Sequence, residues 1–205
     1  MVWVKICGIT RKEDLQAAAD AGADAVGLIT GIPESPRNLS EDRITLLAEY
    51  ARKTTNLVLV ARAEYVESNI DLIRKIQPWA VQVYGELSRR HLFDTDNIKL
   101  IKCVGSYTEC LPPKFDDCYA VMVDTHDHFH SAGRAAIDVE LCKRIKSIVH
   151  PKPIIVAGGL NPSNVRDVIA SVRPFGVDAS SGLEISPGLK DREKMKEFVK
   201  NAKGG

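Results

Sequence analysis

Several features that would assign this chain to a membrane, a nucleic acid or a disulfide-bonded scaffold are missing from its sequence. No apolar stretch approaches the roughly 20 residues that span a bilayer, and no basic region followed by an apolar one opens the chain. The 28 basic and 27 acidic residues leave a formal net charge of +1, too little for the broad positive field that nucleic acid or an anionic membrane requires. We therefore expect a cytoplasmic protein whose partners are small molecules, with no nucleic acid and no membrane among them.

The cysteines lack any regular arrangement. There are five, an odd number, and no two stand in CxxC spacing, which argues against both a disulfide framework and a zinc ribbon. Most are expected to be small buried apolar residues. Cys7 needs separate consideration, because it lies where an apolar run gives way to glycine in the segment VKICGIT, residues 4–10.

What the sequence does contain is a regular alternation of short β-rich runs with amphipathic helical stretches. The helical stretches open with acids or capping residues and close on bases, and the near-continuous apolar runs are typical of a parallel sheet covered on both faces. The runs lie at 2–8, 25–29, 57–61, 80–85, 99–105, 120–125, 153–159 and 176–182. Eight strand and helix units with 44% hydrophobic residues predict an α/β fold, a single-domain (β/α)8 TIM barrel over residues 1–205.

The chain is shorter than the roughly 250 residues typical of this fold, so we expect short loops and no inserted domain. The stretches after the fourth and fifth strands are weak helix formers, and Pro112 and Pro113 end the second, so a reduced fifth helix is expected. An open doubly wound sheet is the main alternative. It would normally show a glycine-rich dinucleotide turn after its first strand, where the segment ICGITRKED has a single glycine.

In a barrel the chemistry lies at the carboxyl ends of the strands, and here the loops after the seventh and eighth strands suit an anion. The segment AGGLNPSN leads from a strand into Asn161, a good N-cap, and Pro162, which suits the first helical position. Free N–H groups and a helix dipole would then face the barrel mouth, and the loop DASSGLEISPG adds unhindered donors. Two tight turns are the alternative. We predict that a phosphate binds to the backbones of Gly158, Gly159, Ser180, Ser181 and Gly182.

Asp124 ends the apolar strand AVMVDT, where a carboxyl group is costly to bury without a partner, although a turn or capping aspartate is the alternative. The barrel would place it across the mouth from Cys7, so that the pair exchanges protons with opposite ends of one small substrate. No histidine stands at a predicted strand end to activate a nucleophile. For Cys7 this favours a thiolate base over an attacking thiol, with a buried spacer as the other interpretation.

Two loops offer further candidates. Arg37 follows Ser35 and Pro36 in a loop of defined shape, where its guanidinium either clamps a carboxylate or lies at the surface. The loop DTHDHFHSAGR, residues 124–134, carries three of the five histidines. A solvated lid is favoured there over a catalytic metal, because a polar loop with glycine does not hold ligands in fixed geometry.

Taken together and in order, these segments resemble the phosphoribosylanthranilate isomerase family of tryptophan biosynthesis. The resemblance covers nearly the whole chain and rests on KICGIT (5–10), GADAVGLI (22–29), SPRNLS (35–40), VQVYGE (81–86), VDT (123–125), PIIVAGGLNPSNV (153–165) and GVDASSGLEISPGLKD (176–191). It implies an aldose–ketose isomerase that converts N-(5-phosphoribosyl)anthranilate to 1-(2-carboxyphenylamino)-1-deoxyribulose 5-phosphate by an acid/base Amadori rearrangement. It also implies no cofactor, no metal, and a monomer or homodimer.

The same resemblance implies roles for individual residues. Cys7 would be the general base and Asp124 the general acid, while Arg37 would hold the anthranilate carboxylate. The five residues of the two anion loops would hold the substrate phosphate. Asp178 matches a family aspartate that either contacts a substrate hydroxyl or supports the structure.

The sequence departs from the family pattern in three places. Tyr84 stands where the family often has histidine, Arg62 and Glu64 replace an apolar segment that ends in asparagine, and Asp138 lacks its usual aromatic neighbours.

Other phosphosugar barrels stay open as alternatives, among them a sugar-phosphate epimerase and the aldose–ketose isomerase of histidine synthesis. The first would want metal ligands at several strand ends, and the second an aspartate where Cys7 stands. A non-catalytic phosphosugar-binding barrel would need neither Cys7 nor Asp124.

Overall fold

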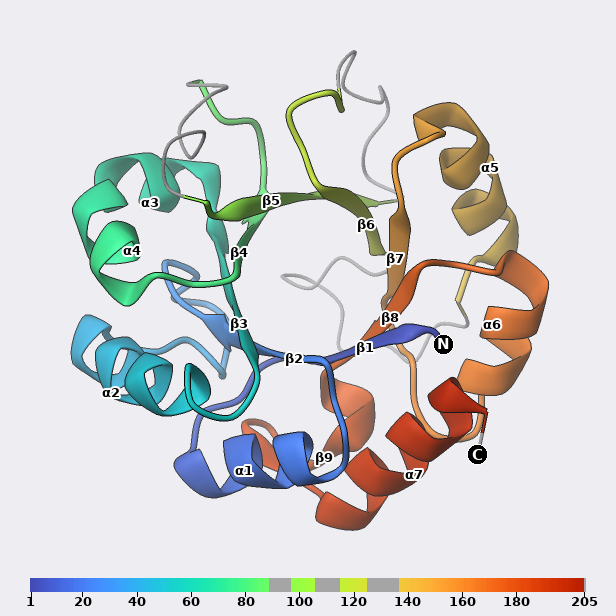
Figure 1. The fold of residues 1–205 in the computed structure, drawn as a ribbon, viewed down its shortest axis with the longest axis horizontal. Helices are drawn as coiled ribbons and strands as arrows, with labels where there is room; N and C mark the ends of the chain where they lie inside the picture. Colours follow the sequence, from blue (N-terminus) through green and yellow to red (C-terminus); the bar gives the residue numbers. More distant parts are fainter. Residues whose placement is uncertain (89–96, 106–114, 125–136, 205) are drawn as a thin grey trace.

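The computed structural model is a closed barrel of eight parallel strands that follow one another in sequence order (Figure 1). It describes residues 1–88, 97–105, 115–124 and 137–204. The strands are β1 (Trp3–Ile6), β2 (Ala25–Ile29), β3 (Asn56–Arg62), β4 (Ala80–Tyr84), β5 (Lys99–Gly105), β6 (Ala120–Asp124), β7 (Ile154–Ala157) and β8 (Gly176–Ala179). The barrel closes where Trp3 of β1 pairs with Gly176 of β8 and Ile6 pairs with Ala179. The predicted TIM barrel is confirmed, and the doubly wound sheet is excluded because such a sheet would leave its edges unpaired.

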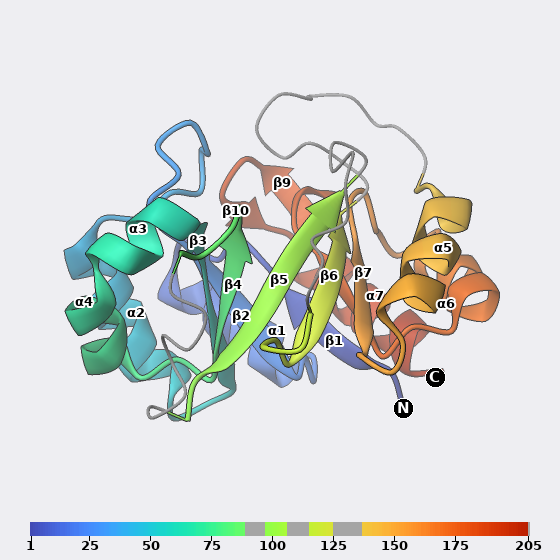
Figure 2. The ribbon, with the colours of Figure 1, turned by 90° about the horizontal axis from the view of Figure 1, so that it is seen from above.

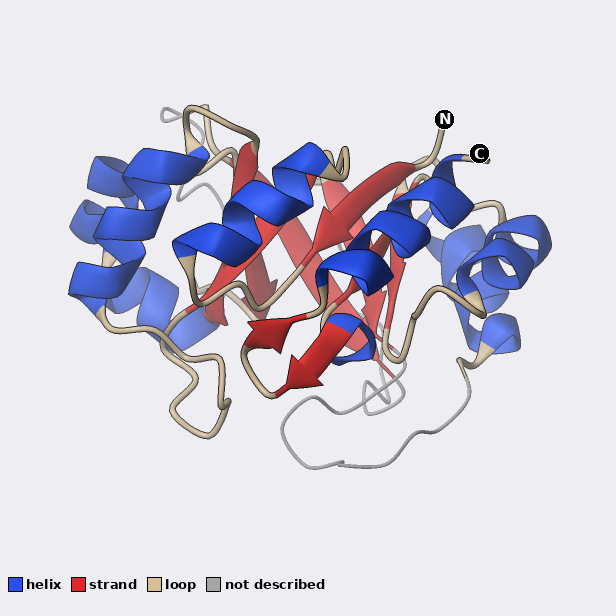
Figure 3. Cartoon of the chain, turned by 90° about the horizontal axis from the view of Figure 1, so that it is seen from below, coloured by secondary structure: helices blue, strands red, loops and turns tan. Residues whose placement is uncertain are grey.

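The helices cover the outside of the barrel, as Figure 3 shows. Each presents one apolar stripe to the strands; in α7, for example, Met195, Phe198, Val199 and Ala202 are buried. Asp138 and Asp191 cap α5 and α7 by accepting hydrogen bonds from N–H groups of the first turn. The described helices are α1 (Lys12–Asp20), α2 (Glu41–Ala51), α3 (Ala63–Ser68), α4 (Ile70–Ile76), α5 (Val139–Val149), α6 (Val165–Val172) and α7 (Arg192–Lys203). No helix among the described ranges is long and apolar enough to cross a membrane.

Two helical predictions need comment. The periodic stretch VESNIDLIRKI after the third strand, residues 66–76, predicts one helix, but the structure has α3 and α4, divided at Asn69. The Asn69 side chain donates to the Tyr65 carbonyl at 2.8 Å, a local bond that competes with helix propagation. The weak stretches after β4 and β5 fall mainly on residues 89–96 and 106–114, outside the described residues, so the reduced fifth helix stays a prediction.

Side chains of the strands alternate between two cores. One cluster includes helix residues such as Leu15 and Phe198 together with Val4 and Ile6 of β1, and therefore lies between sheet and helices. The other consists mainly of the opposite strand positions, including Cys7 and Tyr84, and fills the barrel interior. The period of two thus directs Cys7 inward.

The two ends of the barrel differ. At the amino-terminal ends of the strands, aromatic rings close the interior, with Trp3 stacked on Trp79 at a centroid distance of 5.6 Å and on Phe175 at 6.1 Å. At the carboxyl ends a small hairpin, β9 (Glu184–Ser186) and β10 (Leu189–Lys190), rises beside the barrel (Figure 2). The chemistry is therefore sought at the end that carries the hairpin.

Candidate active site

Cys7 lies directly after β1, with only 5% of its surface exposed. Its backbone N–H donates to the Ala179 carbonyl of β8 at 2.9 Å, which fixes the thiol inside the barrel. A Cβ atom on Gly27 of β2 would lie 2.7 Å from the Cys7 sulfur and 3.1 Å from Cε of Lys5. The two side chains therefore converge on one point of β2 that only glycine leaves open.

Lys5 is a component of this site that sequence reasoning missed. Its side chain is fully buried, and its Nζ lies 2.9 Å from Oδ1 of Asp178 on β8. The register of the β1 and β8 pair, in which Lys5 stands opposite Asp178, produces this contact. The available signal was a lysine that shares the inward face of an apolar strand with Cys7.

The proposed base role requires a thiol that ionises readily, but the burial of Cys7 acts in the other direction. Burial raises the pKa of Cys7, and the positive charge of Lys5 is the strongest influence that lowers it. For Lys5, burial favours the neutral amine, yet Asp178 and Cys7 outweigh it and raise the lysine pKa above its usual value. Lys5 is therefore an ammonium group beside a thiol that is protonated at neutral pH.

Asp124 lies at the end of β6 and is fully buried. Its Oδ2 accepts a hydrogen bond from the Tyr84 hydroxyl at 2.9 Å, and Gln82 donates to that hydroxyl at 3.4 Å. Burial, and after it the charge of Asp124, raise the pKa of Tyr84 well above its usual value; the Cys7 charge acts in the same direction. The phenol therefore stays protonated and donates to Asp124.

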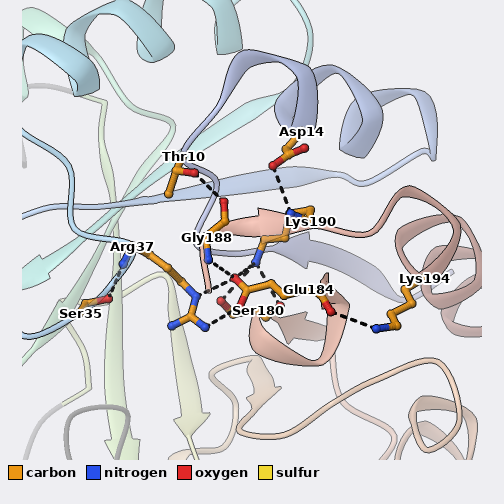
Figure 4. Close-up of polar contacts among 9 residues, drawn as sticks. All are labelled: Thr10, Asp14, Ser35, Arg37, Ser180, Glu184, Gly188, Lys190 and Lys194. Atoms are coloured by element: carbon orange, nitrogen blue, oxygen red, sulfur yellow. Dashed lines mark hydrogen bonds and ion pairs between the residues drawn. The ribbon is translucent and has the colours of Figure 1, made fainter. Parts of the chain in front are cut away.

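Arg37 reaches over the mouth from the loop after β2, as Figure 4 shows. A Cβ atom on Gly8, which has a φ of 72°, would lie 2.4 Å from Arg37 Cδ and 2.7 Å from Ser180 Oγ. The arginine thus covers the residue next to Cys7. Its Nε and Nη2 donate to the two carboxylate oxygens of Glu184 at 2.7 and 2.6 Å. In this structure the carboxylate on Arg37 is therefore supplied by the chain itself.

Glu184, the first residue of the hairpin strand β9, links Arg37 to the loop after β8 by way of Lys190 (Figure 4). Its Oε1 also accepts from Lys190 Nζ at 2.8 Å, and the same Nζ donates to the Ser180 carbonyl at 3.0 Å. Burial opposes ionisation of Glu184, but Arg37 and Lys190 outweigh it and hold its pKa below the usual value. The sequence analysis did not identify Glu184 and Lys190 as a pair. The available signal was their position on either side of the turn at Pro187 and Gly188.

The two predicted anion loops touch each other. Gly158 and Gly159 have φ values of 90° and 86°, the left-handed region that favours glycine. A Cβ atom on Gly182 would lie 2.2 Å from the Leu160 carbonyl oxygen, so the loop after β8 packs directly on the loop after β7. The structure thus brings the five predicted phosphate-binding residues into two adjoining loops.

Asn161, the predicted N-cap, makes the contacts of a capping residue. Its side chain accepts from the Ser163 N–H at 2.8 Å, and its carbonyl accepts from the Val165 N–H at 3.2 Å. Its own N–H donates to the Asn164 side chain at 2.9 Å, the reciprocal bond of a capping box. The regular part of α6 begins after this turn, at Val165.

Comparison with known proteins assigns this arrangement to a family. A family model described as N-(5'phosphoribosyl)anthranilate (PRA) isomerase matches residues 4–201. The chain belongs to the N-(5'-phosphoribosyl)anthranilate isomerase family. The enzyme of that name from Haloarcula marismortui is 35% identical over 210 residues, which cover 99% of this chain and 97% of the relative. The resemblance predicted from the sequence segments is confirmed.

Solved structures of the family have the same fold. A phosphoribosylanthranilate isomerase in complex with reduced 1-(o-carboxyphenylamino)-1-deoxyribulose 5-phosphate superposes with a TM-score of 0.78 at 34% identity. Monomers generated from the dimeric enzyme of Thermotoga maritima give a TM-score of 0.78 at 33% identity. Both comparisons cover 100% of this chain and 100% of the other. The Thermotoga maritima enzyme is therefore a dimer from which monomers have been generated.

The departures from the family pattern have structural explanations. Tyr84, in place of a histidine, donates to Asp124. Arg62 forms an ion pair with Glu34 in the loop after β2. Asp138 caps α5, so its role does not depend on aromatic neighbours. Tyr84, Arg62 and Asp138 thus each have a defined contact within this chain.

The histidine-rich loop lies outside the described residues, since His126, His128 and His130 fall within 125–136. Among the residues that are described, no group of three His, Cys, Asp or Glu side chains is arranged to hold a metal ion. The interpretation of that loop as a lid stays a prediction.

Proposed function

We propose that this chain carries out the reaction of its family, with Cys7 as general base and Asp124 as general acid. The substrate would be N-(5-phosphoribosyl)anthranilate and the product 1-(2-carboxyphenylamino)-1-deoxyribulose 5-phosphate, in tryptophan biosynthesis. The observation that carries the proposal is that a buried thiol and a buried carboxyl group lie at the carboxyl ends of β1 and β6 of one barrel. Such a pair suits proton transfer at two atoms of one substrate.

The proposed reaction begins at Asp124. Its carboxylic acid protonates the furanose ring oxygen, the C1′–O bond breaks, and an iminium ion forms between C1′ and the anthranilate nitrogen. The iminium charge acidifies the C2′ hydrogen, which the Cys7 thiolate removes as a proton. The resulting enolamine gains a proton at C1′ and loses the proton of its C2′ hydroxyl, which gives the ketose. Hydrogen is moved within the molecule, so no external oxidant or reductant enters the balance.

Tyr84 is proposed to position the acid. Its hydroxyl engages Oδ2 of Asp124 at 2.9 Å, which fixes the plane of the carboxyl group. The acid then meets the ring oxygen in one orientation instead of several. The carboxyl group has already lost its rotational freedom in the folded protein, so this loss does not add to the activation barrier.

Substrate binding is proposed to use both sides of the mouth. The phosphate would bind to the backbones of Gly158, Gly159, Ser180, Ser181 and Gly182, whose two loops pack together. Arg37 would hold the anthranilate carboxylate, because Arg37 and Lys190 together exceed the charge of Glu184 by one and leave a net attraction for an anion. For Asp178 we propose structural support through Lys5 instead of contact with a substrate hydroxyl.

We propose that residues 1–205 act as one domain that needs only its small-molecule substrate as a partner. All proposed site residues come from a single barrel, so a monomer and a homodimer would each hold a complete site. The cytoplasm is the proposed location, because a thiol base requires a reducing compartment and the described cysteines, Cys7, Cys103, Cys118 and Cys142, are unpaired.

The proposal is tested by mixing the protein with N-(5-phosphoribosyl)anthranilate and following the anthranilate fluorescence in the presence of a chelator. We expect the fluorescence to decay at a rate proportional to protein concentration. No decay in chelator or in its absence would leave a binding barrel without catalysis. Decay that the chelator abolishes would instead favour a catalytic metal.

A further inference from the structure

We infer that Lys5 is a positioning residue that holds Cys7 as a thiolate during the reaction, and that Asp178 fixes Lys5 for this task. The inference deepens the proposed function, because it rests on Cys7 being the base. It concerns three residues that meet at the closure of the barrel between β1 and β8.

The geometry places the lysine where a thiolate needs a cation. Lys5 and Cys7 share the inward face of β1 and both touch the same open point beside Gly27. The Lys5 ammonium has no exposed surface and lies 2.9 Å from Asp178 Oδ1. The Asp178 carboxylate therefore holds the Lys5 ammonium group inside the barrel, on the same face of β1 as the Cys7 sulfur.

The cost of this arrangement favours a functional role. An ion pair sealed inside a barrel loses its hydration, and replacing such a pair by apolar residues of similar volume is often neutral or stabilising. Stability therefore gives little reason to place a lysine at the inward-facing position of an otherwise apolar strand, whose neighbouring residues in sequence, Val4 and Ile6, are buried against the helices. A cation beside a thiol, by contrast, directly favours the reactive form of that thiol.

The other charges around Cys7 do not replace Lys5. Asp178 on β8 opposes ionisation of the thiol, and Lys190 on β10 favours it more weakly than Lys5 does. In the described part of the chain, Arg37 and Tyr84 also interact with the charge of the sulfur. Burial still dominates and raises the Cys7 pKa. The iminium charge of the proposed intermediate would add a second cation at the moment when the thiolate is needed.

The test measures the thiol directly, by the rate at which iodoacetamide alkylates Cys7 as a function of pH, with Cys7→Ala identifying the signal. A Lys5→Met/Asp178→Asn variant removes both charges and leaves no unpaired buried ion. We expect its alkylation profile to move upward by at least about one pH unit, a tenfold loss of thiolate at neutral pH. Lys5→Arg keeps the charge and should stay close to the wild-type profile.

A matched control is available in the chain. Lys102 and Asp117 form another shielded pair, 2.9 Å apart with each side chain 11% exposed, and neither is among the charges that act on Cys7. Lys102→Met/Asp117→Asn should leave the alkylation profile unchanged. If the Lys5→Met/Asp178→Asn double variant does not fold, Lys5→Gln/Asp178→Asn carries the test, because it also removes both charges but leaves two polar side chains that can bond to each other, and the profile should again move upward.

The outcomes separate this inference from the proposed function. An alkylation profile that stays at the wild-type position in the folded double variant, Lys5→Met/Asp178→Asn or Lys5→Gln/Asp178→Asn, would overturn the role of Lys5 while leaving Cys7 as the base. Turnover that survives Cys7→Ser would instead overturn the proposed base, whatever the alkylation profile shows.

Discussion

Replacing Glu184 by glutamine is expected to destabilise the protein strongly, because it removes the one carboxylate between two cations. Glu184 accepts hydrogen bonds from Arg37 at 2.6 and 2.7 Å and from Lys190 at 2.8 Å (Figure 4). The side chains of Glu184 and Lys190 are 5% and 0% exposed, and that of Arg37 is 17% exposed. Glu184→Gln keeps the shape but removes the carboxylate that pairs with both cations in the described part of the chain.

The magnitude follows from this burial. Breaking a buried ion pair by removing one partner typically costs 3–5 kcal/mol. Partial exposure of Arg37 and the amide oxygen that glutamine retains reduce this, so we expect a loss of about 2–3 kcal/mol in the free energy of unfolding. For a chain of this size, each kcal/mol corresponds to roughly 2–4 °C, which gives a decrease in Tm of about 4–12 °C.

The pH dependence has a definite sign. The folded-state pKa of Glu184 is lowered, so its contribution to stability is present above the unfolded pKa of about 4.3 and is lost as the pH falls through the folded value. The difference between wild type and Glu184→Gln should therefore be full at pH 7 and shrink below about pH 4.

The assay is urea unfolding of wild type and variant at both pH values, with Glu193→Gln as the control. Glu193 pairs with Lys196 at the surface, where the side chains are 81% and 62% exposed, so its replacement should change stability by no more than about 0.5 kcal/mol. If Glu184→Gln and Glu193→Gln are equally stable at pH 7, the reasoning about the Glu184 network is refuted.

Two further predictions concern the acid and the phosphate loops. Tyr84→Phe should lower kcat by about tenfold or more with little change in KM, because the Asp124 carboxyl group loses its fixed orientation. Steady-state kinetics check this, and a change in KM alone would contradict it. Gly182→Ala should weaken inhibition by inorganic phosphate by at least about tenfold, because its methyl group would displace the Leu160 carbonyl oxygen 2.2 Å away. The control is Gly204→Ala, which has open space around its Cβ, and equal inhibition of both variants would contradict the prediction.

The fold, and the places of the proposed site residues at the strand ends, could be predicted from the sequence because both depend on local patterns. Apolar runs alternating with amphipathic helices give the barrel, and the period of two along β1 and β6 turns Cys7 and Asp124 inward. Paired glycines ahead of a helix likewise indicate an anion loop without knowledge of distant residues.

The contacts that tune the site depend on register and could not be predicted in the same way. Lys5 meets Asp178 across 173 positions of sequence, and Arg37 meets Glu184 across 147. Which side chains stand opposite each other is decided by how β1 closes on β8 and how the β9 and β10 hairpin folds back. A sequence that shows each residue on its own strand or loop does not show these pairings.

The central claim, that Cys7 and Asp124 perform the proton transfers, is tested most directly by single-turnover conversion of N-(5-phosphoribosyl)anthranilate with Cys7→Ser and Asp124→Asn. The affinity for the reduced product analogue is measured beside it, to separate chemistry from binding. We expect each variant to lose about 10²–10⁴-fold in the rate of conversion, while the analogue binds within a few-fold of wild type. Conversion by either variant within tenfold of the wild-type rate would contradict the claim.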